Sequence, residues 1–505
     1  VHGVTIVDPY RWLEGDNSNP AQMGAMTPEV AQWTDAQNAY TRQTLDNLPG
    51  RKAVEDALRP LMEVGSVSSP RMRGDRYFYS KREGTQNQAS VYMRIGHDGE
   101  PRLLLDPAKI DPSGLTTISW TSPSHDGKLL AYGTYVAGDE NSTLRISNVD
   151  TGEHLPDVIS GKVGGCDWMP DGKSFMYRNL ADIKNPYSGQ VMYHKLGQDQ
   201  SADAQIFRQF TVEENAKLAT TYGPYGALSE DGEWILLAYY TDTRNNDLWA
   251  VRTSDFLATG DAERREILVG ESAQSFGPVI DGVLYMETTF EAPNGRVVAV
   301  DLESPDRSNW REIVPHREDA VIQGISAADG IIAVDYLVNA SSTIELVGFD
   351  GSKKSQLTLP GIGSAGVSTN EDRTEAFLSF TSFNYPTSIF RVDLAKPTAQ
   401  PRLWERPDVP VNPDSVTVTQ EWYTSKDGTK VSMFIVHKKG IELDGNNPTL
   451  LYGYGGFNIS LTPSFSASLF QWLDAGGVYA VANLRGGGEY GQAWHNAGML
   501  ENKQN

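Results

Sequence analysis

Two short apolar segments near the C-terminal end of the chain, each followed by a glycine-rich turn, are the residues best placed for chemistry. The first, Thr449–Tyr452, runs into Gly453–Phe457, and the second, Val478–Asn483, runs into Arg485–Gly491. Short apolar runs bounded by glycines indicate strands of a parallel sheet that are buried on both faces. Ligands bind at the carboxyl ends of such strands. A single turn of this kind is as readily explained by tight chain reversal alone, but two in succession favour a site.

The residues around these turns predict the elements that position them. Pro407–Pro413 is a proline-rich connector of the kind that separates domains. After it, Ser415–Thr424 and Lys430–His437 alternate polar and apolar residues, which predicts a hairpin. Between the two apolar segments, Ser464–Ala475 is expected to be partly helical. An antiparallel hairpin followed by strand, helix and strand is one way in which an α/β-hydrolase sheet begins.

The middle of the chain carries a repeat of short alternating strands. A turn recurs about every 45 to 60 residues, the interval of four-stranded propeller blades. The turns that mark the repeat are Gly74-Asp75, Asp126-Gly127, Asp171-Gly172, Asp231-Gly232, Asp281-Gly282, Asp329-Gly330 and Glu371-Asp372. Turn residues between apolar strands predict antiparallel hairpins, and radially arranged sheets leave few open edges. The repeat therefore predicts a seven-bladed β-propeller, a scaffold that does not by itself assign a function.

The first part of the chain predicts helices. Thr27 can cap a helix whose first position is Pro28, and apolar residues recur at helical spacing up to Tyr40. A second helical stretch spans Arg51–Leu61. Segment Asp8–Glu14, which precedes both helices, carries two aromatic residues that need a surface to cover them. We expect this segment and both helices to lie against another domain.

Composition excludes several classes of partner. With 43 Lys and Arg against 65 Asp and Glu, the formal charge of -22 argues against binding to nucleic acid or an anionic membrane. No apolar run approaches the length of a membrane span, so we expect a soluble protein, with the compartment open between cytoplasm and periplasm. The single cysteine, Cys166, excludes an intramolecular disulfide, and the eight scattered histidines show no metal-ligand spacing.

With these residues in hand, the chain resembles the prolyl oligopeptidase family, serine peptidases in which a seven-bladed propeller covers an α/β-hydrolase domain. The resemblance covers essentially the whole chain. It implies helices packing on the hydrolase domain at 1–65, the propeller at 66–406 and the start of the catalytic domain at 407–505. Gly456 and Tyr490 favour the proline-specific branch, because the related oligopeptidase B typically has serine and leucine there. The motifs that carry the resemblance to the prolyl oligopeptidase family are Asp8–Glu14, Tyr452–Asn458, Ala482–Gly491 and Asn502–Asn505.

The resemblance implies roles for two residues of the first turn. Acyl transfer places negative charge on the former carbonyl oxygen, and the phenolic hydroxyl of Tyr454 matches the family residue that donates a hydrogen bond to it. Phe457 matches the family aromatic that lines the proline pocket, where a flat ring can stack on pyrrolidine.

The nucleophile of such an enzyme has no counterpart in these residues. A Gly-x-Ser-x-Gly turn, which would carry the serine, does not occur. The family places the Ser, Asp and His downstream of Asn502–Asn505, so His437 and His495 are poor candidates for the base. We therefore expect the remainder of the hydrolase domain to be a separate segment or chain.

The activity implied by the resemblance is hydrolysis of short peptides on the carboxyl side of proline, through an acyl-enzyme, by a monomer without metal or organic cofactor. The propeller would restrict the size of the substrate. Two alternatives stay open: a non-catalytic propeller that only binds a partner, and an enzyme of the same architecture that transfers the acyl group to a peptide amine and makes macrocycles.

Overall fold

The computed structural model describes residues 7–19, 24–261 and 263–504, and contacts divide the chain into two units, one ending at Met62 and the other beginning at Glu63. In the first unit, helices α1 (Pro28–Asp46) and α2 (Arg51–Met62) follow a short 3-10 turn, η1 (Arg11–Glu14). The side chain of Thr27 accepts a hydrogen bond from the backbone N–H of Val30 at 3.2 Å, which confirms the predicted start of α1.

Two tryptophans join η1 to α1. The rings of Trp12 and Trp33 meet edge to face, with their centroids 6.0 Å apart. No residue of α1 or α2 is fully buried. The expectation that these helices and Asp8–Glu14 lie against another domain stays a prediction.

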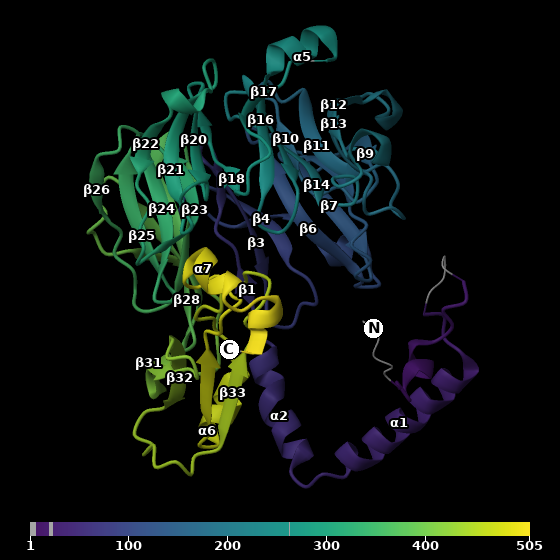
Figure 1. The fold of residues 1–505 in the computed structure, drawn as a ribbon, viewed down its shortest axis with the longest axis vertical. Coiled ribbons are helices and arrows are strands. Elements are labelled where there is room, and N and C mark those ends of the chain that lie inside the picture. The colour runs from purple at the N-terminus through teal and green to yellow at the C-terminus, as the bar shows by residue number, and fades with distance from the viewer. Residues whose placement is uncertain (1–6, 20–23, 262, 505) are drawn as a thin grey trace. The chain divides into compact units, whose positions relative to one another are not determined.

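Seven antiparallel sheets follow one another along the second unit and form the blades of a propeller (Figure 1). The first four blades consist of β1 (Ser66–Val67), β2 (Arg71–Arg73), β3 (Arg76–Arg82), β4 (Ser90–Ile95) and β5 (Arg102–Leu105); β6 (Thr116–Pro123), β7 (Leu129–Val136), β8 (Thr143–Asn148) and β9 (His154–Ile159); β10 (Cys166–Trp168), β11 (Ser174–Leu180), β12 (Gly189–Lys195) and β13 (Ala204–Arg208); and β14 (Gly223–Leu228), β15 (Trp234–Tyr240), β16 (Asn246–Arg252) and β17 (Arg265–Leu268).

The last three blades have the same arrangement. They consist of β18 (Ser275–Phe276), β19 (Val279–Ile280), β20 (Val283–Thr288), β21 (Arg296–Asp301) and β22 (Arg311–Val314); β23 (Val321–Ala328), β24 (Ile331–Val338), β25 (Ser341–Gly348) and β26 (Lys353–Gln356); and β27 (Ser364–Asn370), β28 (Arg373–Ser382), β29 (Tyr385–Asp393) and β30 (Arg402–Glu405). Short helices α3 (Pro107–Ile110), α4 (Val212–Asn215) and α5 (Thr253–Thr259) lie in connections.

Every turn that marks the repeat in the sequence makes the same connection in its blade. Each one joins the innermost strand segment to the long second strand, as Asp126-Gly127 joins β6 to β7 and Asp329-Gly330 joins β23 to β24. Glycine suits these tips because Gly127 and Gly330 have φ of 67° and 65°, a left-handed conformation that side chains disfavour. The prediction of seven blades is confirmed.

Each pair of neighbouring blades shares its own hydrophobic cluster. Trp234 of β15 packs with Leu284 of β20, for example, and Phe175 of β11 packs with Leu144 of β8. Seven such clusters, one per interface, replace the single core of a compact domain.

No strand is shared between the first and last blades, so side chains close the ring. Tyr77 of β3 donates a hydrogen bond to Glu375 of β28 at 2.7 Å, and Arg94 of β4 pairs with Glu405 of β30 at 2.5 Å. Trp404 of β30 donates to the carbonyl oxygen of His97 at 2.6 Å.

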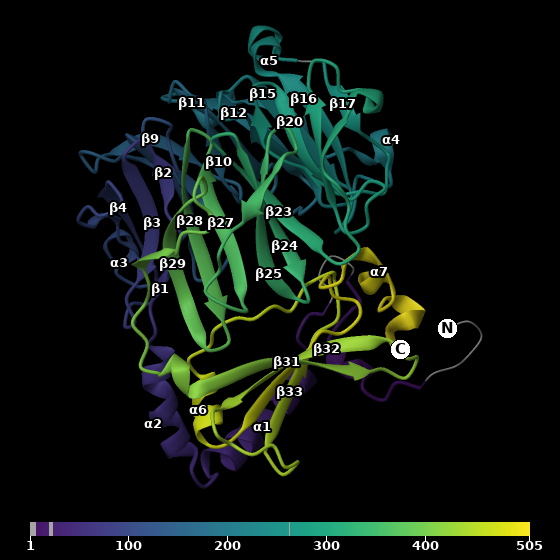
Figure 2. The ribbon, with the colours of Figure 1, turned by 90° about the vertical axis from the view of Figure 1, so that its left-hand side faces the viewer.

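An eighth, mixed sheet follows the propeller (Figure 2). Its strands β31 (Val416–Thr424), β32 (Lys430–Lys438), β33 (Thr449–Gly453) and β34 (Val478–Ala482) lie in the order β31-β32-β34-β33. The predicted hairpin is β31 paired with β32, and helix α6 (Leu469–Asp474) lies in the segment expected to be partly helical. Phe383 of the propeller packs on Phe434 of β32, with ring centroids 5.4 Å apart.

The predicted boundaries at 65/66 and 406/407 stay predictions, although the propeller strands run from Ser66 to Glu405. None of the helices in the described ranges is both long enough and apolar enough to cross a membrane.

Candidate active site

The two glycine-rich turns lie at the same edge of the mixed sheet. Strands β33 and β34 are parallel neighbours, and Gly453 at the end of β33 is in register with Ala482 at the end of β34. The two segments that follow these strands therefore leave the sheet side by side, at the carboxyl ends of the strands. This is the placement that the sequence predicted.

The two turns touch through their backbones. The N–H of Asn458 donates a hydrogen bond to the carbonyl oxygen of Gly486 at 3.1 Å. A β-carbon on Gly486 would lie 2.3 Å from the carbonyl oxygen of Gly455, and one on Gly455 would lie 2.6 Å from the β-carbon of Leu484. Both glycines also have positive φ, 100° for Gly486 and 63° for Gly455. Glycine is therefore required at these two positions by both space and backbone conformation.

Tyr454 and Phe457, the two predicted site residues, both lie on the first turn. Their ring centroids are 6.4 Å apart, and the ring planes are inclined by 35°. The Tyr454 side chain is 43% exposed and that of Phe457 is 74% exposed, so both rings are accessible to a ligand. Phe457 has a φ of 55°, a conformation uncommon for a bulky residue. Such local strain is often retained where it positions a functional side chain.

A buried polar network supports the second turn. Glu489, which is 1% exposed, accepts hydrogen bonds from the N–H of Leu461 at 2.8 Å and from the amide of Asn483 at 3.4 Å. Burial raises the pKa of the Glu489 carboxyl. Asn483 in turn accepts from Ser432, and Tyr490 donates to Ser432 at 2.6 Å. No structural role was predicted for these residues from the sequence, although a carboxylate within a glycine-rich turn, Glu489, was a signal that could have indicated one.

Arg485 ties the second turn to the hairpin. Its guanidinium forms an ion pair with Asp427 and donates to Ser425 at 3.1 Å and to Thr429 at 3.2 Å. Its side chain is 8% exposed, and this pair lowers the pKa of Asp427 well below its usual range. The charge therefore anchors the turn and is not directed at a ligand.

The two histidines of this part of the chain have structural contacts, and only His495 lies beside the glycine-rich turns, because the register of β32 with β34 places His437 toward the opposite end of the sheet. His495, on helix α7 (Gly491–Asn496), is buried and its Nδ1 lies 2.6 Å from the carbonyl oxygen of Gly486. His437, on β32, is hydrogen-bonded through Nδ1 to the carbonyl oxygen of Lys438 at 2.8 Å. That neither histidine is the catalytic base stays a prediction.

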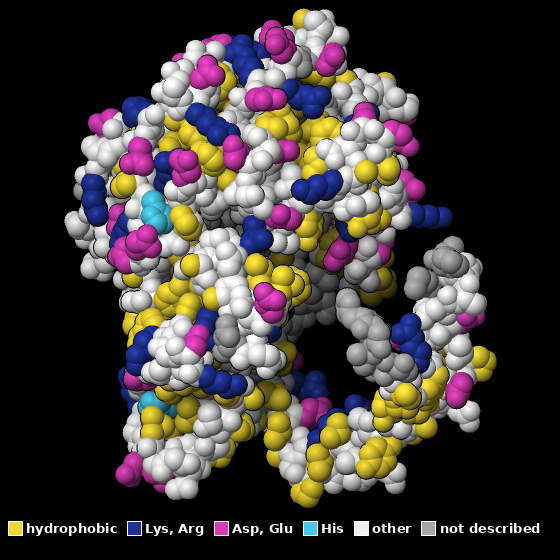
Figure 3. Space-filling model, viewed as in Figure 1, with side chains coloured by type: hydrophobic (Ala, Val, Ile, Leu, Met, Phe, Trp, Pro, Cys, Tyr) yellow, Lys and Arg dark blue, Asp and Glu magenta, His cyan; other side chains and the backbone are white. Residues whose placement is uncertain are grey.

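Strand β33 differs from the sequence-based expectation, which was burial on both faces. Leu450, Leu451 and Tyr452 are exposed, whereas most of β34 is buried. The reason is the order of the sheet, in which β34 lies between two strands and β33 is an edge. Hydrophobic side chains are accordingly exposed in this part of the molecule (Figure 3).

Comparison with protein families matches both parts of this architecture. Residues 1–403 match the model described as "Prolyl oligopeptidase, N-terminal beta-propeller domain", and residues 463–505 match "Prolyl oligopeptidase family". The chain belongs to the prolyl oligopeptidase family. The match to the second model includes α6, β34 and the second glycine-rich turn, and the propeller model includes six complete blades and most of the seventh.

Individual relatives agree with this family membership. The chain is 30% identical to a prolyl endopeptidase of Elizabethkingia meningoseptica. The match covers the full length of this chain and 69% of that protein. It is 28% identical to a dual function macrocyclase-peptidase of Galerina marginata, over 99% of this chain and 71% of that protein.

Solved structures show the same fold. One, from a study of two prolyl endopeptidases and the role of inter-domain dynamics, superposes with a TM-score of 0.88 at 36% identity, covering 100% of this chain and 72% of the other. Prolyl oligopeptidase B from Galerina marginata bound to a 35mer hydrolysis and macrocyclization substrate superposes with a TM-score of 0.87 at 26% identity, over 99% of this chain and 71% of the other.

Proposed function

We propose that this chain works in a serine-type endopeptidase that cleaves short peptides on the carboxyl side of proline. The observation that carries the proposal is the placement of Tyr454 and Phe457 together on the turn after β33, beside the second glycine turn. The relatives named prolyl endopeptidase support the same specificity.

In this proposal Tyr454 stabilises the transition state. A serine oxygen attacks the carbonyl carbon of proline, and the carbonyl oxygen becomes an oxyanion that accepts a hydrogen bond from the Tyr454 hydroxyl. The C–N bond then breaks, the amine leaves with a proton, and water hydrolyses the acyl-enzyme. Among the described residues none forms a hydrogen bond with the hydroxyl of Tyr454, and the residue is exposed, so the hydroxyl is available to donate to this oxygen.

Phe457 accounts for the preference for proline. A pyrrolidine ring is apolar and rigid, and an exposed phenyl ring offers it a flat surface at little entropic cost. The neighbouring backbone at Asn458 is fixed by its hydrogen bond to Gly486, so the ring is held by a turn of defined shape.

The serine, the acid and the base are assigned to no residue of this chain. The exposed edge of β33, with Leu450, Leu451 and Tyr452, supports the further proposal that additional strands of the hydrolase domain pair with it. Such strands would carry the missing groups, as a separate segment or chain.

One measurement tests the function. Mass spectrometry of the products from a peptide with one internal proline identifies the bond that is cleaved, and it separates a linear product from a cyclic one. The relationship to a macrocyclase-peptidase makes the cyclic product the specific alternative. Cleavage at all residues equally, or binding of the peptide without turnover in the presence of the whole hydrolase domain, contradicts the proposal.

A further inference from the structure

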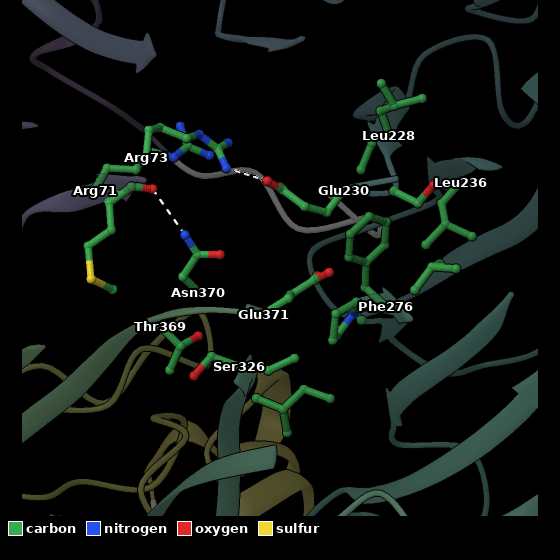
Figure 4. Close-up of a pocket in the computed structure, with 18 residues that line it drawn as sticks. Arg71, Arg73, Leu228, Glu230, Leu236, Phe276, Ser326, Thr369, Asn370 and Glu371 are labelled. Atoms are coloured by element: carbon green, nitrogen blue, oxygen red, sulfur yellow. Dashed lines mark hydrogen bonds and ion pairs between the residues drawn. The ribbon is translucent and has the colours of Figure 1, made fainter. Parts of the chain in front are cut away.

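A cavity of about 240 Å³ lies inside the propeller, among residues of the first four blades. Its lining includes Arg71 of β2, Trp120 of β6, Arg178 of β11 and Tyr225 of β14. Arg71 also lines a second cavity of about 410 Å³, where Arg73, Glu230 and Glu371 lie (Figure 4). The two cavities therefore adjoin at Arg71.

The charged groups of the second cavity are partly paired. Arg73 of the first blade forms an ion pair with Glu230, at the turn after β14 in the fourth blade, and Glu230 also lies 3.1 Å from Nδ1 of His125. Arg73 and His125 hold the pKa of Glu230 at about 2 despite its burial. The positive charge of Arg73 is thus neutralised within the protein.

Arg71 and Arg178 differ from Arg73. Neither guanidinium forms an ion pair or a hydrogen bond with another residue in the described ranges, and the contacts of these two side chains are longer-range charge interactions and, for Arg178, an aromatic ring. The guanidinium of Arg178 lies over the ring of Tyr225, with its Cζ 4.2 Å from the ring centroid. Arg71 is exposed to solvent within the cavity, and partial desolvation by the surrounding propeller and the neighbouring Arg73 lower its pKa. Two guanidinium groups therefore face one cavity with unused donors, in a protein whose formal charge is -22.

One carboxyl group, that of Asp167, also lines this cavity, and it does not neutralise the arginines by direct contact. It forms no ion pair with Arg71 or Arg178 and accepts a hydrogen bond from the N–H of Leu228 at 3.3 Å. Burial raises the pKa of Asp167, although both arginines favour its charged form.

We propose that Arg71 and Arg178 bind the C-terminal carboxylate of a short peptide inside the propeller. Guanidinium donors match the two oxygens of a carboxylate. Trp120 and Tyr225 provide apolar surface for the residue next to that carboxylate, which an inorganic anion would not use. This proposal rests on the proposed function in one respect, namely that short peptides are the ligands of this enzyme.

Calorimetric titration of the protein with a proline-free peptide tests the site without relying on cleavage. The probes are N-acetyl-Ala-Gly-Ala as the free acid, the same peptide as its C-terminal amide, and inorganic phosphate. We expect the acid to bind about tenfold more tightly than the amide, because one charge-assisted contact contributes about that factor. Phosphate should bind more weakly than the acid.

Variants assign the effect to the two arginines. Arg71→Gln and Arg178→Gln should each reduce the affinity for the acid to that for the amide, and Asp167→Asn should increase it. Arg402→Gln, at an exposed arginine on β30, the last strand of the seventh blade, is the matched control and should bind as the unaltered protein does.

Equal affinity for acid and amide would overturn the proposal, and so would full affinity in both arginine variants. Phosphate binding as tight as that of the acid would show a general anion site and overturn the assignment to a peptide terminus. If a variant does not melt cooperatively, the comparison of acid with amide on the unaltered protein still decides. Failure to cleave after proline, with acid-selective binding retained, would contradict the proposed function alone.

Discussion

The ring centroids of Tyr454 and Phe457 lie 6.4 Å apart on the turn that follows β33. One residue offers a hydrogen-bond donor and the other an apolar ring, and the same short loop fixes both. In the proposed reaction these groups act on adjacent parts of one residue, the carbonyl oxygen and the pyrrolidine ring of proline. A single turn therefore links specificity to transition-state stabilisation.

Replacing Phe457 with alanine should weaken selection of proline more than it slows the chemical step. We expect kcat/KM for a proline substrate to fall by about 10- to 200-fold, mainly through a higher KM, because an apolar contact in a pocket contributes about 1 to 3 kcal/mol. Steady-state kinetics with paired proline and alanine substrates measures this. Ile459→Ala, at another exposed apolar residue near the turn, is the control. An unchanged proline-to-alanine ratio would remove Phe457 from the pocket.

Replacing Gly486 with alanine should destabilise the contact between the two turns. Gly476→Ala is the matched control, because Gly476 has a φ of 84° but nothing within 4 Å of an added β-carbon. Both variants incur the cost of a left-handed conformation, about 1 to 2 kcal/mol. Only Gly486→Ala adds the clash with Gly455, so urea unfolding should show a larger loss of unfolding free energy for Gly486→Ala than for Gly476→Ala. Equal losses would mean that the turns separate without cost.

Stability should depend on pH through His194, which is buried between two carboxylates. Its Nδ1 lies 2.7 Å from Asp203 and its Nε2 lies 3.0 Å from Asp157. Burial alone would lower the pKa of His194, but the hydrogen bonds to Asp203 and Asp157 outweigh it and raise the pKa above its ordinary value of 6.5. The charged imidazole thus stabilises the folded state fully below pH 6.5, and this contribution is lost as the pH rises through the raised pKa.

The comparison of unaltered protein with His194→Gln isolates this contribution. Denaturant unfolding from pH 6 to 9 should show a difference in unfolding free energy that is largest at the acidic end and shrinks toward the alkaline end. His154→Gln, which removes an imidazole bonded to Tyr132 at 3.2 Å, serves as the control and should not reproduce this decline. A difference that grows with pH would show that His194 is neutral in the folded protein.

The blades and the ends of strands β33 and β34 could be predicted from the sequence because both depend on local signals, whereas the roles of Tyr454 and Phe457 stay predictions. Asp-Gly pairs such as Asp231-Gly232 encode hairpin tips through the left-handed conformation of glycine, and apolar runs before Gly453 and Arg485 encode strand ends. The parallel pairing of β33 with β34 followed from the longer connection between them.

Features that depend on the order of strands or on distant residues were not accessible in this way. The exposure of β33 follows from its position at the edge of the sheet, which no local pattern records. Arg71 and Arg178 lie in different blades. They line the same cavity only because the blades of the propeller are arranged in a closed ring. Glu489 and His495 are buried by the packing of one turn on another, which their neighbours in the sequence do not reveal.

The most direct test of the account is the turnover of Tyr454→Phe in the active enzyme, compared with Tyr452→Phe. Tyr452 lies two positions earlier, within strand β33 and before the turn, so its variant removes the same kind of hydroxyl from a position outside the proposed oxyanion site. If Tyr454 donates to the oxyanion, its variant should lose about 2 to 4 kcal/mol of transition-state stabilisation, seen in kcat with a proline substrate. Tyr452→Phe should keep its activity. Unaltered turnover in Tyr454→Phe would contradict the assignment of this turn as part of the catalytic site.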